Sequence, residues 1–260
     1  MTMIEVTHLS KSFGGVHAVQ DVSFEIPAGV VYSVIGPNGA GKTTLFNLIS
    51  GLYTPSGGSI RFRGSEVAGM APNRLAARGM SRTFQNLQVC MNLGALDNVM
   101  VGAHLKLDGG LLSGLFRKPG LMRADRRTRA RAADLLAFVG CAAYVRAEAS
   151  AMPYGALKRL EIARALMSDP QILFLDEPAA GLNHTETHEI EELVATLAKA
   201  GLTVVLVEHD MKLVMNVSDR ILVLDHGRRL AEGTPAEIRV NRDVIAAYLG
   251  AAAAEEKSHG

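Results

Sequence analysis

One glycine-rich segment, residues 36–44, combines residue types and spacing that suit the binding of phosphate groups. It follows the pattern G-x-x-x-x-G-K-[ST] and consists of Gly36, Pro37, Asn38, Gly39, Ala40, Gly41, Lys42, Thr43 and Thr44. Glycines let the backbone curl so that successive N–H groups face phosphate oxygens, and a helix that begins here adds partial positive charge. We expect the Lys42 ammonium between the β- and γ-phosphates and the Thr43 hydroxyl on Mg²⁺. The segment therefore predicts a site for ATP with its Mg²⁺.

A pair of carboxylates, Asp176 and Glu177, directly follows the apolar segment Ile172–Leu175. If this segment is a strand beside the one that leads to Gly36, Asp176 lies where it can hold Mg²⁺, directly or through water. Glu177 then faces a water in line with the γ-phosphate and can act as its general base. An acidic pair can be a plain strand end, and a glycine-rich turn can bind nothing. However, a chance match to the glycine-rich pattern is expected in on the order of one per cent of chains of this length, so together the motifs favour ATP hydrolysis.

Short apolar segments alternate with helical patterns in the part of the chain that carries these residues. Val30–Ile35, Ile172–Leu175 and Thr203–Val207 are continuously apolar, which is typical of strands buried on both faces of a parallel sheet. Lys42–Ser50 has a helical pattern and precedes Gly51, a typical residue at a helix C-terminus. This alternation predicts an α/β domain built around the P-loop of residues 36–44.

The first sixty residues and the last strands have a different pattern. Ile4–Leu9, Val22–Ile26 and Ser59–Phe62 are short apolar segments separated by turns that contain Gly and Pro, which indicates an antiparallel flank. Arg220–Leu224 and Arg228–Ala231 form a strand, turn and strand pattern near the end. We therefore predict an α/β fold with a P-loop (RecA-like) core, a largely parallel sheet, an antiparallel β flank and an inserted all-helical lobe.

The middle of the chain, residues 86–154, has no clear strand pattern and contains a basic segment over residues 123–131. Acidic residues interrupt that segment and no aromatic residues lie within it, so we favour a solvated helix face over a polyanion site. We predict a nucleotide-binding core from residues 1–86 and 160–250, a helical lobe over residues 87–159, and a disordered tail over residues 251–260.

Composition excludes several classes of protein. Hydrophobic residues make up 48% and charged residues 20% of 260 residues, and a net charge of +1 gives no electrostatic reason to expect a nucleic-acid partner. The two cysteines, Cys90 and Cys141, favour thiols in a reducing cytosol over a disulfide framework. We expect no secretory signal at the N-terminus, and the apolar segments are too short to span a bilayer.

The order of these motifs resembles that of the ATP-binding-cassette family over nearly the whole chain. The resemblance implies that Phe13 stacks on adenine with Val19 beside the base. It also implies that Gln85 links Mg²⁺ and the attacking water to the helical lobe. Residues 179–183 are similar to the loop that crosses to a partner cassette, and His209 is similar to the switch histidine that contacts the γ-phosphate.

The family signature Leu-Ser-Gly-Gly-Gln corresponds to residues 152–156, where only Gly155 is identical. The serine hydroxyl is absent, and Pro153 at its position also lacks an N–H. Backbone donors remain at Tyr154, Gly155 and Ala156, again at a helix N-terminus. The resemblance thus implies that two cassettes sandwich two ATP molecules, with two donors fewer at each signature segment.

Within the family, the chain resembles the larger ATPase subunit of bacterial branched-chain amino acid importers. The matching segments are residues 178–183, 211–215, 218–221, 233–238 and 243–250, together with the long segment 104–122. The resemblance implies an ATPase on the cytoplasmic face of the inner membrane. Its partners would be two permease subunits, a second cassette (a copy or a paralogue) and, indirectly, a periplasmic binding protein.

Several alternatives remain open at this point. A urea or amide importer uses a similar subunit, whereas a lipid exporter predicts a shorter middle segment than this one. Cassettes for DNA repair or translation usually have two fused copies or a long coiled-coil insert, which this chain lacks. A module that binds ATP without hydrolysis is disfavoured by Glu177 and His209. His184 and His188 are four residues apart, but Thr185 follows the first, so we favour a solvated helix face over a zinc site.

Overall fold

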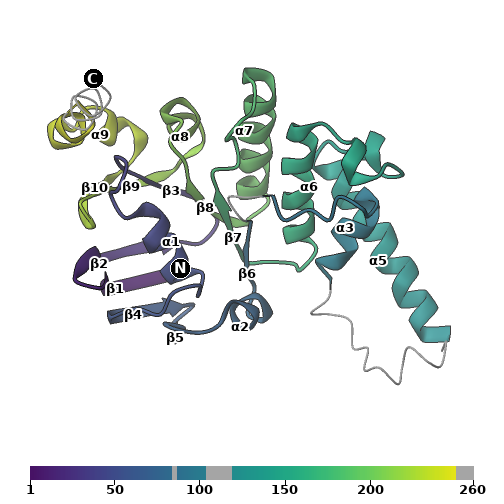
Figure 1. Cartoon of the computed structure of the whole chain (residues 1–260), viewed down its shortest axis with the longest axis horizontal. Coiled ribbons are helices and arrows are strands. Elements are labelled where there is room, and N and C mark those ends of the chain that lie inside the picture. Colours follow the sequence, from purple (N-terminus) through teal and green to yellow (C-terminus); the bar gives the residue numbers. More distant parts are fainter. Residues whose placement is uncertain (84–86, 104–118, 250–260) are drawn as a thin grey trace.

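A six-stranded sheet forms the centre of the computed structural model (Figure 1), which describes residues 1–83, 87–103 and 119–249, the first six of the last range by backbone alone. Its strand order is β10-β9-β3-β8-β7-β6. The strands are β3 (Val31–Ile35), β6 (Met80–Arg82), β7 (Ile172–Asp176), β8 (Thr203–Val207), β9 (Arg220–Asp225) and β10 (Arg228–Gly233). All neighbours are parallel except β10, which returns antiparallel along β9.

The register of this sheet brings the ends of three strands together. Val207 at the end of β8 lies opposite Val34 of β3 on one side and Asp176 of β7 on the other. Because the carboxyl ends of parallel strands meet at one edge, the segments that follow Ile35, Asp176 and Val207 must lie side by side.

A second, antiparallel sheet of four strands lies beside the first (Figure 1), in the order β2-β1-β4-β5. Its strands are β1 (Thr2–Phe13), β2 (Val16–Pro27), β4 (Gly57–Phe62) and β5 (Ser65–Glu66). Helix α1 (Lys42–Ile49) buries Leu45, Phe46, Leu48 and Ile49 in an apolar cluster shared with both sheets. The predicted α/β fold with its antiparallel flank is therefore confirmed.

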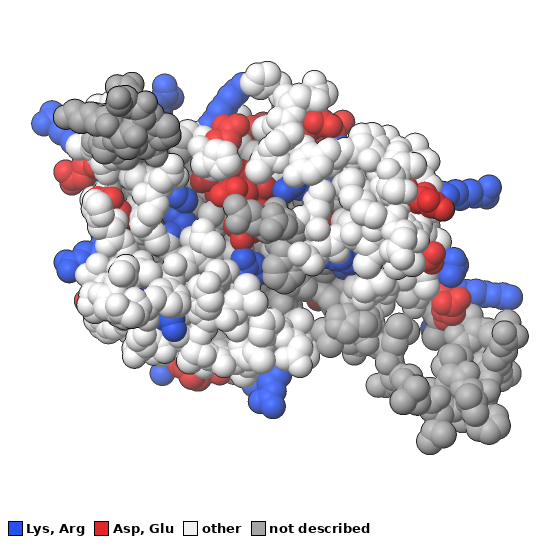
Figure 2. Space-filling view, viewed as in Figure 1, with Lys and Arg blue, Asp and Glu red and all other residues white. Residues whose placement is uncertain are grey.

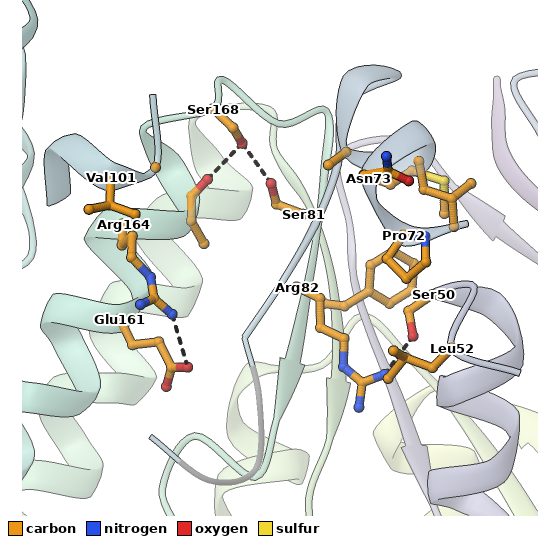
Figure 3. Close-up of a pocket in the computed structure, with 16 residues that line it drawn as sticks. Ser50, Leu52, Pro72, Asn73, Ser81, Arg82, Val101, Glu161, Arg164 and Ser168 are labelled. Atoms are coloured by element: carbon orange, nitrogen blue, oxygen red, sulfur yellow. Dashed lines mark hydrogen bonds and ion pairs between the residues drawn. The ribbon is translucent and has the colours of Figure 1, made fainter. Parts of the chain in front are cut away.

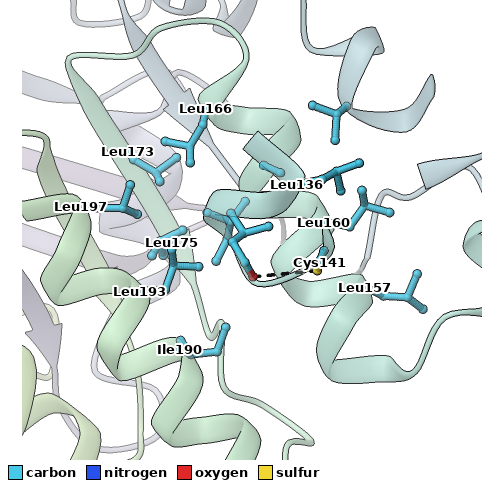
Figure 4. Packing of buried hydrophobic residues seen from close by; sticks show 14 of the residues in the cluster. Leu136, Cys141, Leu157, Leu160, Leu166, Leu173, Leu175, Ile190, Leu193 and Leu197 are labelled. Atoms are coloured by element: carbon cyan, nitrogen blue, oxygen red, sulfur yellow. Dashed lines mark hydrogen bonds between the residues drawn. The ribbon is translucent and has the colours of Figure 1, made fainter. Parts of the chain in front are cut away.

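The helices on the far side of the large sheet share one hydrophobic cluster with it (Figure 4). The helical segments of this part are α3 (Ala95–Val101), α5 (Pro119–Phe138), η2 (Ala142–Tyr144), η3 (Ala149–Ala151) and α6 (Tyr154–Leu166). The cluster joins Leu136 of α5 and Leu160 of α6 to Leu173 and Leu175 of β7. Helix α2 (Pro72–Ala77) instead buries Leu75 in the cluster that α1 shares with both sheets. The boundary predicted between residues 159 and 160 falls inside α6, and the division into core and lobe stays a prediction.

The remaining helices follow strands of the large sheet, except the last, which follows another helix. They are α7 (His184–Lys199), α8 (Met211–Val217), α9 (Pro235–Arg239) and a last helix over residues 242–249. Helix α7 begins with a capping box in which Asn183 and Glu186 bond each other's backbone N–H, and it buries Ile190, Leu193, Val194 and Leu197. Its predicted end at Gly201 is confirmed by a left-handed φ of +90°.

The structure contains two short strands that were not predicted, β5 at the edge of the antiparallel sheet and one in the large sheet. Residues Met80–Arg82 form β6, which pairs with β7 and was not predicted, because three residues that include Ser81 and Arg82 show no apolar pattern. The basic segment lies on α5, where the described side chains of residues 125–127 are exposed. No helix of the described residues is both long enough and apolar enough to span a bilayer. Gln85, the segment 104–118 and the tail lie outside the described residues.

Candidate functional site

The glycine-rich segment connects β3 to α1, as predicted, and two of its glycines have no room for a side chain. A Cβ on Gly36 would lie 2.1 Å from the carbonyl oxygen of Leu224, and one on Gly41 would lie 2.4 Å from that of Ala18. Gly41 also has φ +97°, in the left-handed region that favours glycine. The loop therefore lies directly on neighbouring backbone, and its curvature is imposed by β9 and β2 as well as by its own sequence.

The Lys42 side chain folds back over the loop and bonds its first two residues. Its Nζ donates hydrogen bonds to the carbonyl oxygens of Gly36 (2.7 Å) and Pro37 (3.0 Å). Burial lowers the pKa of Lys42, while the nearby charge of Glu177 acts in the opposite direction. The ammonium group is thus held against the first two residues of the loop, at the N-terminus of α1, where a positive charge suits a polyphosphate.

A pocket of about 470 Å³ opens over the loop. It is lined by Val16, His17, Ala18, Gln20, Gly39, Ala40, Gly41, Lys42, Thr43, Thr44, His226 and Gly227. Gly227 donates its N–H to the carbonyl of Ala40 (3.0 Å), so the turn between β9 and β10 is bound to the loop. His226 and Gln20 were not predicted as pocket residues, since only the folded chain brings that turn beside β2.

The two residues predicted to contact adenine lie in different environments. Phe13, at the end of β1, is 43% exposed and touches Tyr53 edge to face at 5.3 Å between ring centroids. Val19 is 1% exposed and packs in the core, whereas its neighbour Ala18 lines the pocket. Phe13 thus has exposed ring surface on which a base could stack, whereas the Val19 side chain packs β2 against the core. Both contacts with adenine stay predictions.

Asp176 and Glu177 stand at the end of β7, at the edge where the P-loop begins. Asp176 is 3% exposed and its Oδ2 accepts a 2.7 Å bond from the Arg82 guanidinium. Burial raises the pKa of Asp176, while Arg82 acts to lower it. Glu177 has a φ of +47°, which is strained for a residue with a side chain. Its backbone N–H donates to the carbonyl oxygen of Val207 at 2.9 Å. Such strain is typical of active sites, where it aims one side chain.

His209 lies on the segment that follows β8, with its Nδ1 3.9 Å from Glu177 Oε1. Its neighbour Glu208 is 1% exposed and accepts three backbone N–H groups: Ala179 (2.9 Å), His209 (3.0 Å) and Asp210 (3.4 Å). Burial raises the pKa of Glu208, and these hydrogen bonds act to lower it. Glu208 was not predicted, although a carboxylate directly after a buried strand is the signal that identified Asp176.

The signature segment lies at the N-terminus of α6, a helix of 13 residues. Pro153 is its N-cap, and no side chain caps it. A Cβ on Gly155 would lie 2.6 Å from Glu186 Oε1, so a larger residue here would displace the side chain that caps α7. Tyr154 is 45% exposed and its ring lies over Gly181, in the loop of residues 179–183. The first turn of α6 is thus held against the loop predicted to cross to a partner.

The residues present fit a magnesium ion. Mg²⁺ prefers oxygen ligands and keeps several waters, so one hydroxyl and one carboxylate beside a triphosphate form a suitable set. Thr43 stands exposed in the first turn of α1, and Asp176 is a buried carboxylate at the adjoining strand end. Gln85, the third predicted ligand, lies outside the described residues. His184 and His188 are exposed on α7, and His188 Nδ1 lies 3.6 Å from Glu192 on the same helix.

Comparisons with known proteins agree with this geometry. The family model "ABC transporter" matches residues 19–180, and the model "Branched-chain amino acid ATP-binding cassette transporter" matches residues 228–254. The chain is 46% identical, over 96% of its own length and 98% of the relative's, to the high-affinity branched-chain amino acid transport ATP-binding protein BraF of Pseudomonas aeruginosa. It is 45% identical, with the same coverage, to LivG of Escherichia coli, which has the same description.

Solved structures give the same result. The ADP conformation of MJ1267, an ATP-binding cassette of an ABC transporter, matches with a TM-score of 0.83 and 28% identity over 96% of this chain and 99% of that one. A dimeric cassette bound to ADP and Pi, MJ0796, matches with a TM-score of 0.75 and 25% identity over 90% of this chain and 99% of that one. The predicted family is therefore confirmed: this chain belongs to the ABC transporter family, as an ATP-binding cassette that hydrolyses ATP.

Proposed function

We propose that this chain is the ATPase subunit of an importer of branched-chain amino acids. The observation that carries the proposal is the match of residues 228–254 to the branched-chain amino acid cassette model, beside 46% identity to BraF along nearly the whole chain. Import of urea, amides or other small polar solutes is the alternative within the same subgroup. The cargo is chosen by other subunits, so this chain supplies the energy.

In the proposed reaction, the P-loop N–H groups and Lys42 hold the β- and γ-phosphates, and Phe13 stacks on adenine. The Glu177 carboxylate takes the proton of a water in line with the γ-phosphate, and His209 contacts that phosphate. Thr43 and Asp176, with Gln85, would hold Mg²⁺. When bound, this ion neutralises charge on the phosphate oxygens. The Lys42 bonds to Gly36 and Pro37 must open when the phosphates enter, so ATP exchanges one set of acceptors for another.

The proposed site is completed by a second cassette, either a copy of this chain or a paralogue. The N–H groups of Tyr154, Gly155 and Ala156 begin α6, where a partner's γ-phosphate would meet the positive end of the helix. The dimeric state of MJ0796, a relative of the same fold, supports this arrangement.

A groove between α2 and α6 is the proposed docking site for a membrane permease (Figure 3). Its volume is about 340 Å³, and apolar side chains from Leu52, Leu75, Met80, Val101 and Phe174 line much of it. Ser81 and Ser168 bond each other at 2.6 Å across one end. A short amphipathic segment suits such a groove. We place the chain at the cytoplasmic face of the inner membrane, bound to two permeases that receive cargo from a periplasmic binding protein, with no nucleic acid among the partners.

The face shown in Figure 2 carries interspersed acidic and basic side chains over the described residues. This mixture does not suit a polyanion, which selects a continuous basic surface.

The predicted division into a core of residues 1–86 and 160–250 and a lobe of residues 87–159 bears on the docking groove. In the proposed function, core and lobe tilt relative to each other when ATP binds, and the groove lies between them.

The test is to reconstitute the chain in lipid vesicles with two permeases and a binding protein of the same organism that resemble those of branched-chain amino acid importers. Leucine with its binding protein should stimulate ATP hydrolysis and enter the vesicles, whereas urea and acetamide should do neither. Stimulation by urea or amides instead of leucine would replace the proposed cargo. A Glu177→Gln variant should bind ATP, accumulate as a closed dimer and lose turnover, and full turnover in this variant would remove Glu177 as the base.

A further inference from the structure

Arg82 at the end of β6 joins the metal-site carboxylate to α1. Its Nη2 donates to Asp176 Oδ2 at 2.7 Å, while its Nη1 donates to Asn47 Oδ1 at 2.7 Å and to Ser50 Oγ at 2.5 Å. The guanidinium carbon lies 4.7 Å from the centre of the Phe46 ring, and the side chain is only 11% exposed. Asn47, Ser50 and Phe46 all belong to α1 or its C-cap, the helix that carries Lys42 and Thr43 at its other end.

We propose that Arg82 is a positioning residue for the magnesium site, which holds the Asp176 carboxylate at a fixed place relative to α1. This inference rests on the proposed role of Asp176 as a Mg²⁺ ligand. Two features of the contact support it. Arg82 takes one carboxylate oxygen, and no hydrogen bond or ion pair within the described residues uses the other, Oδ1, which is left for the ion or its waters.

The second feature is rigidity. A guanidinium is planar, so bonds from Nη1 to α1 and from Nη2 to Asp176 fix the distance between the helix and the end of β7. The contact of the guanidinium carbon with the Phe46 ring further restricts the movement of the group. Asp176 and Thr43 must approach one ion from two different elements, and Arg82 is a side chain that bonds both of those elements. Residues that orient a metal ligand in this way typically change metal affinity 10- to 100-fold when they are removed.

The experiment measures binding and needs no turnover. The dissociation constant of the non-hydrolysable analogue AMP-PNP is determined by calorimetry in EDTA and then over a series of MgCl2 concentrations, for the wild-type chain, Arg82→Gln and Arg82→Lys. Asp176→Asn is the reference for loss of the metal ligand. Arg164→Gln is the matched control. Arg82 and Arg164 both line the groove between α2 and α6, but Arg164 donates to the carbonyl of Gln88 and lies near Glu161, away from Asp176.

We expect Arg82→Gln to need about 10- to 100-fold more Mg²⁺ for half of the Mg²⁺-dependent gain in affinity. Binding in EDTA should stay within about twofold of wild type, because the P-loop holds the phosphates without Asp176. Arg82→Lys should be intermediate, since it keeps the charge but cannot bond α1 and Asp176 in one plane. Arg164→Gln should match wild type.

Three results would overturn the inference: an unchanged Mg²⁺ midpoint in Arg82→Gln, a midpoint at lower Mg²⁺, or an equal loss of binding with and without the ion. If Arg82→Gln does not fold, Asn47→Ala removes one anchor of the guanidinium and should shift the midpoint in the same direction, and no shift there would overturn it as well. If Asp176→Asn itself leaves the midpoint unchanged, the proposed metal role fails and the inference falls with it. If the Mg²⁺ midpoint shifts in Asp176→Asn but not in Arg82→Gln, the metal role of Asp176 stands and only the positioning role of Arg82 is refuted.

Discussion

Replacement of Gly41 by alanine should destabilise the chain much more than the same change at Gly39, two residues earlier in the P-loop. Both residues have left-handed backbones, with φ +97° and +77°. Around Gly39 a new Cβ would meet nothing within 4 Å, whereas at Gly41 it would lie 2.4 Å from the carbonyl oxygen of Ala18 and 3.4 Å from the Cα of Gly227. The pair therefore separates the cost of the backbone conformation from the cost of the collision.

The magnitudes follow from these two costs. A left-handed conformation costs a residue with a side chain about 1–2 kcal/mol, and forcing a group into a filled space typically costs about 1–3 kcal/mol more. Gly39→Ala should thus lose about 1–2 kcal/mol of unfolding free energy and Gly41→Ala about 2–5 kcal/mol. In a chain of this size the larger loss lowers Tm by roughly 5–15 °C. Since backbone atoms cause the collision, no change of side-chain rotamer relieves it.

The assay is scanning calorimetry of the nucleotide-free chain, so that effects on ATP binding do not enter. Gly64→Ala, at the β4–β5 turn with φ +78° and nothing within 4 Å, is the control outside the site and should behave like Gly39→Ala. Equal Tm values for Gly39→Ala and Gly41→Ala would refute the reasoning, because they would show that the Ala18 carbonyl does not constrain the loop.

Three further predictions concern the site. Phe13→Ala should weaken ATP binding by about 1–3 kcal/mol, the usual worth of an aromatic ring stacked on a base, with little change in Tm because the ring is 43% exposed; isothermal calorimetry measures the first and thermal unfolding the second. His209→Ala should lower steady-state turnover at least tenfold while ATP binding persists, and a phosphate-release assay would contradict this if the rate stayed at the wild-type value. Burial raises the pKa of Glu208, so its proton-linked stability is fully present below the ordinary carboxyl pKa and is lost as pH rises through the raised value. Urea unfolding from pH 4 to pH 8 should therefore show wild type losing stability relative to Glu208→Gln as pH rises, and a difference that grows in favour of wild type would contradict the assigned direction.

The parts of the site that lie along one strand and its next turn were predictable from the sequence. The P-loop, Asp176 and Glu177 each follow a continuously apolar segment, and a buried strand that ends in polar residues has one simple interpretation in a parallel sheet. The order of strands around them was not predictable. The pairing of β8 between β3 and β7, which brings His209 within 3.9 Å of Glu177, follows from the packing of side chains over the whole sheet.

Contacts between distant segments were missed for the same reason. Arg82 stands three residues before Gln85 but had no predicted role, yet it is the partner of Asp176. Tyr248, in the last helix, hydrogen-bonds to the backbone of Gly36 at the start of the P-loop, and burial raises its pKa to about 12. Val19 was predicted to lie beside the base, and its contact with adenine stays a prediction; its side chain lies in the core, while its neighbour Ala18 lines the pocket. Only the register of β1 and β2 decides between these neighbours.

The contacts of α6 give a physical reason why two such sites in the proposed dimer would not act independently. Lys158 of this helix is 3% exposed, and its Nζ donates to the carbonyl of Glu177, the residue proposed as the base, at 3.3 Å. One turn earlier, Tyr154 begins the same helix and lies over Gly181. The surface that would meet a partner's ATP in the proposed dimer is therefore attached, through four residues of helix and one hydrogen bond, to the strained backbone of Glu177, the base proposed for this chain's own ATP. A shift of α6 that improves one contact must move the other, because a helical turn does not stretch.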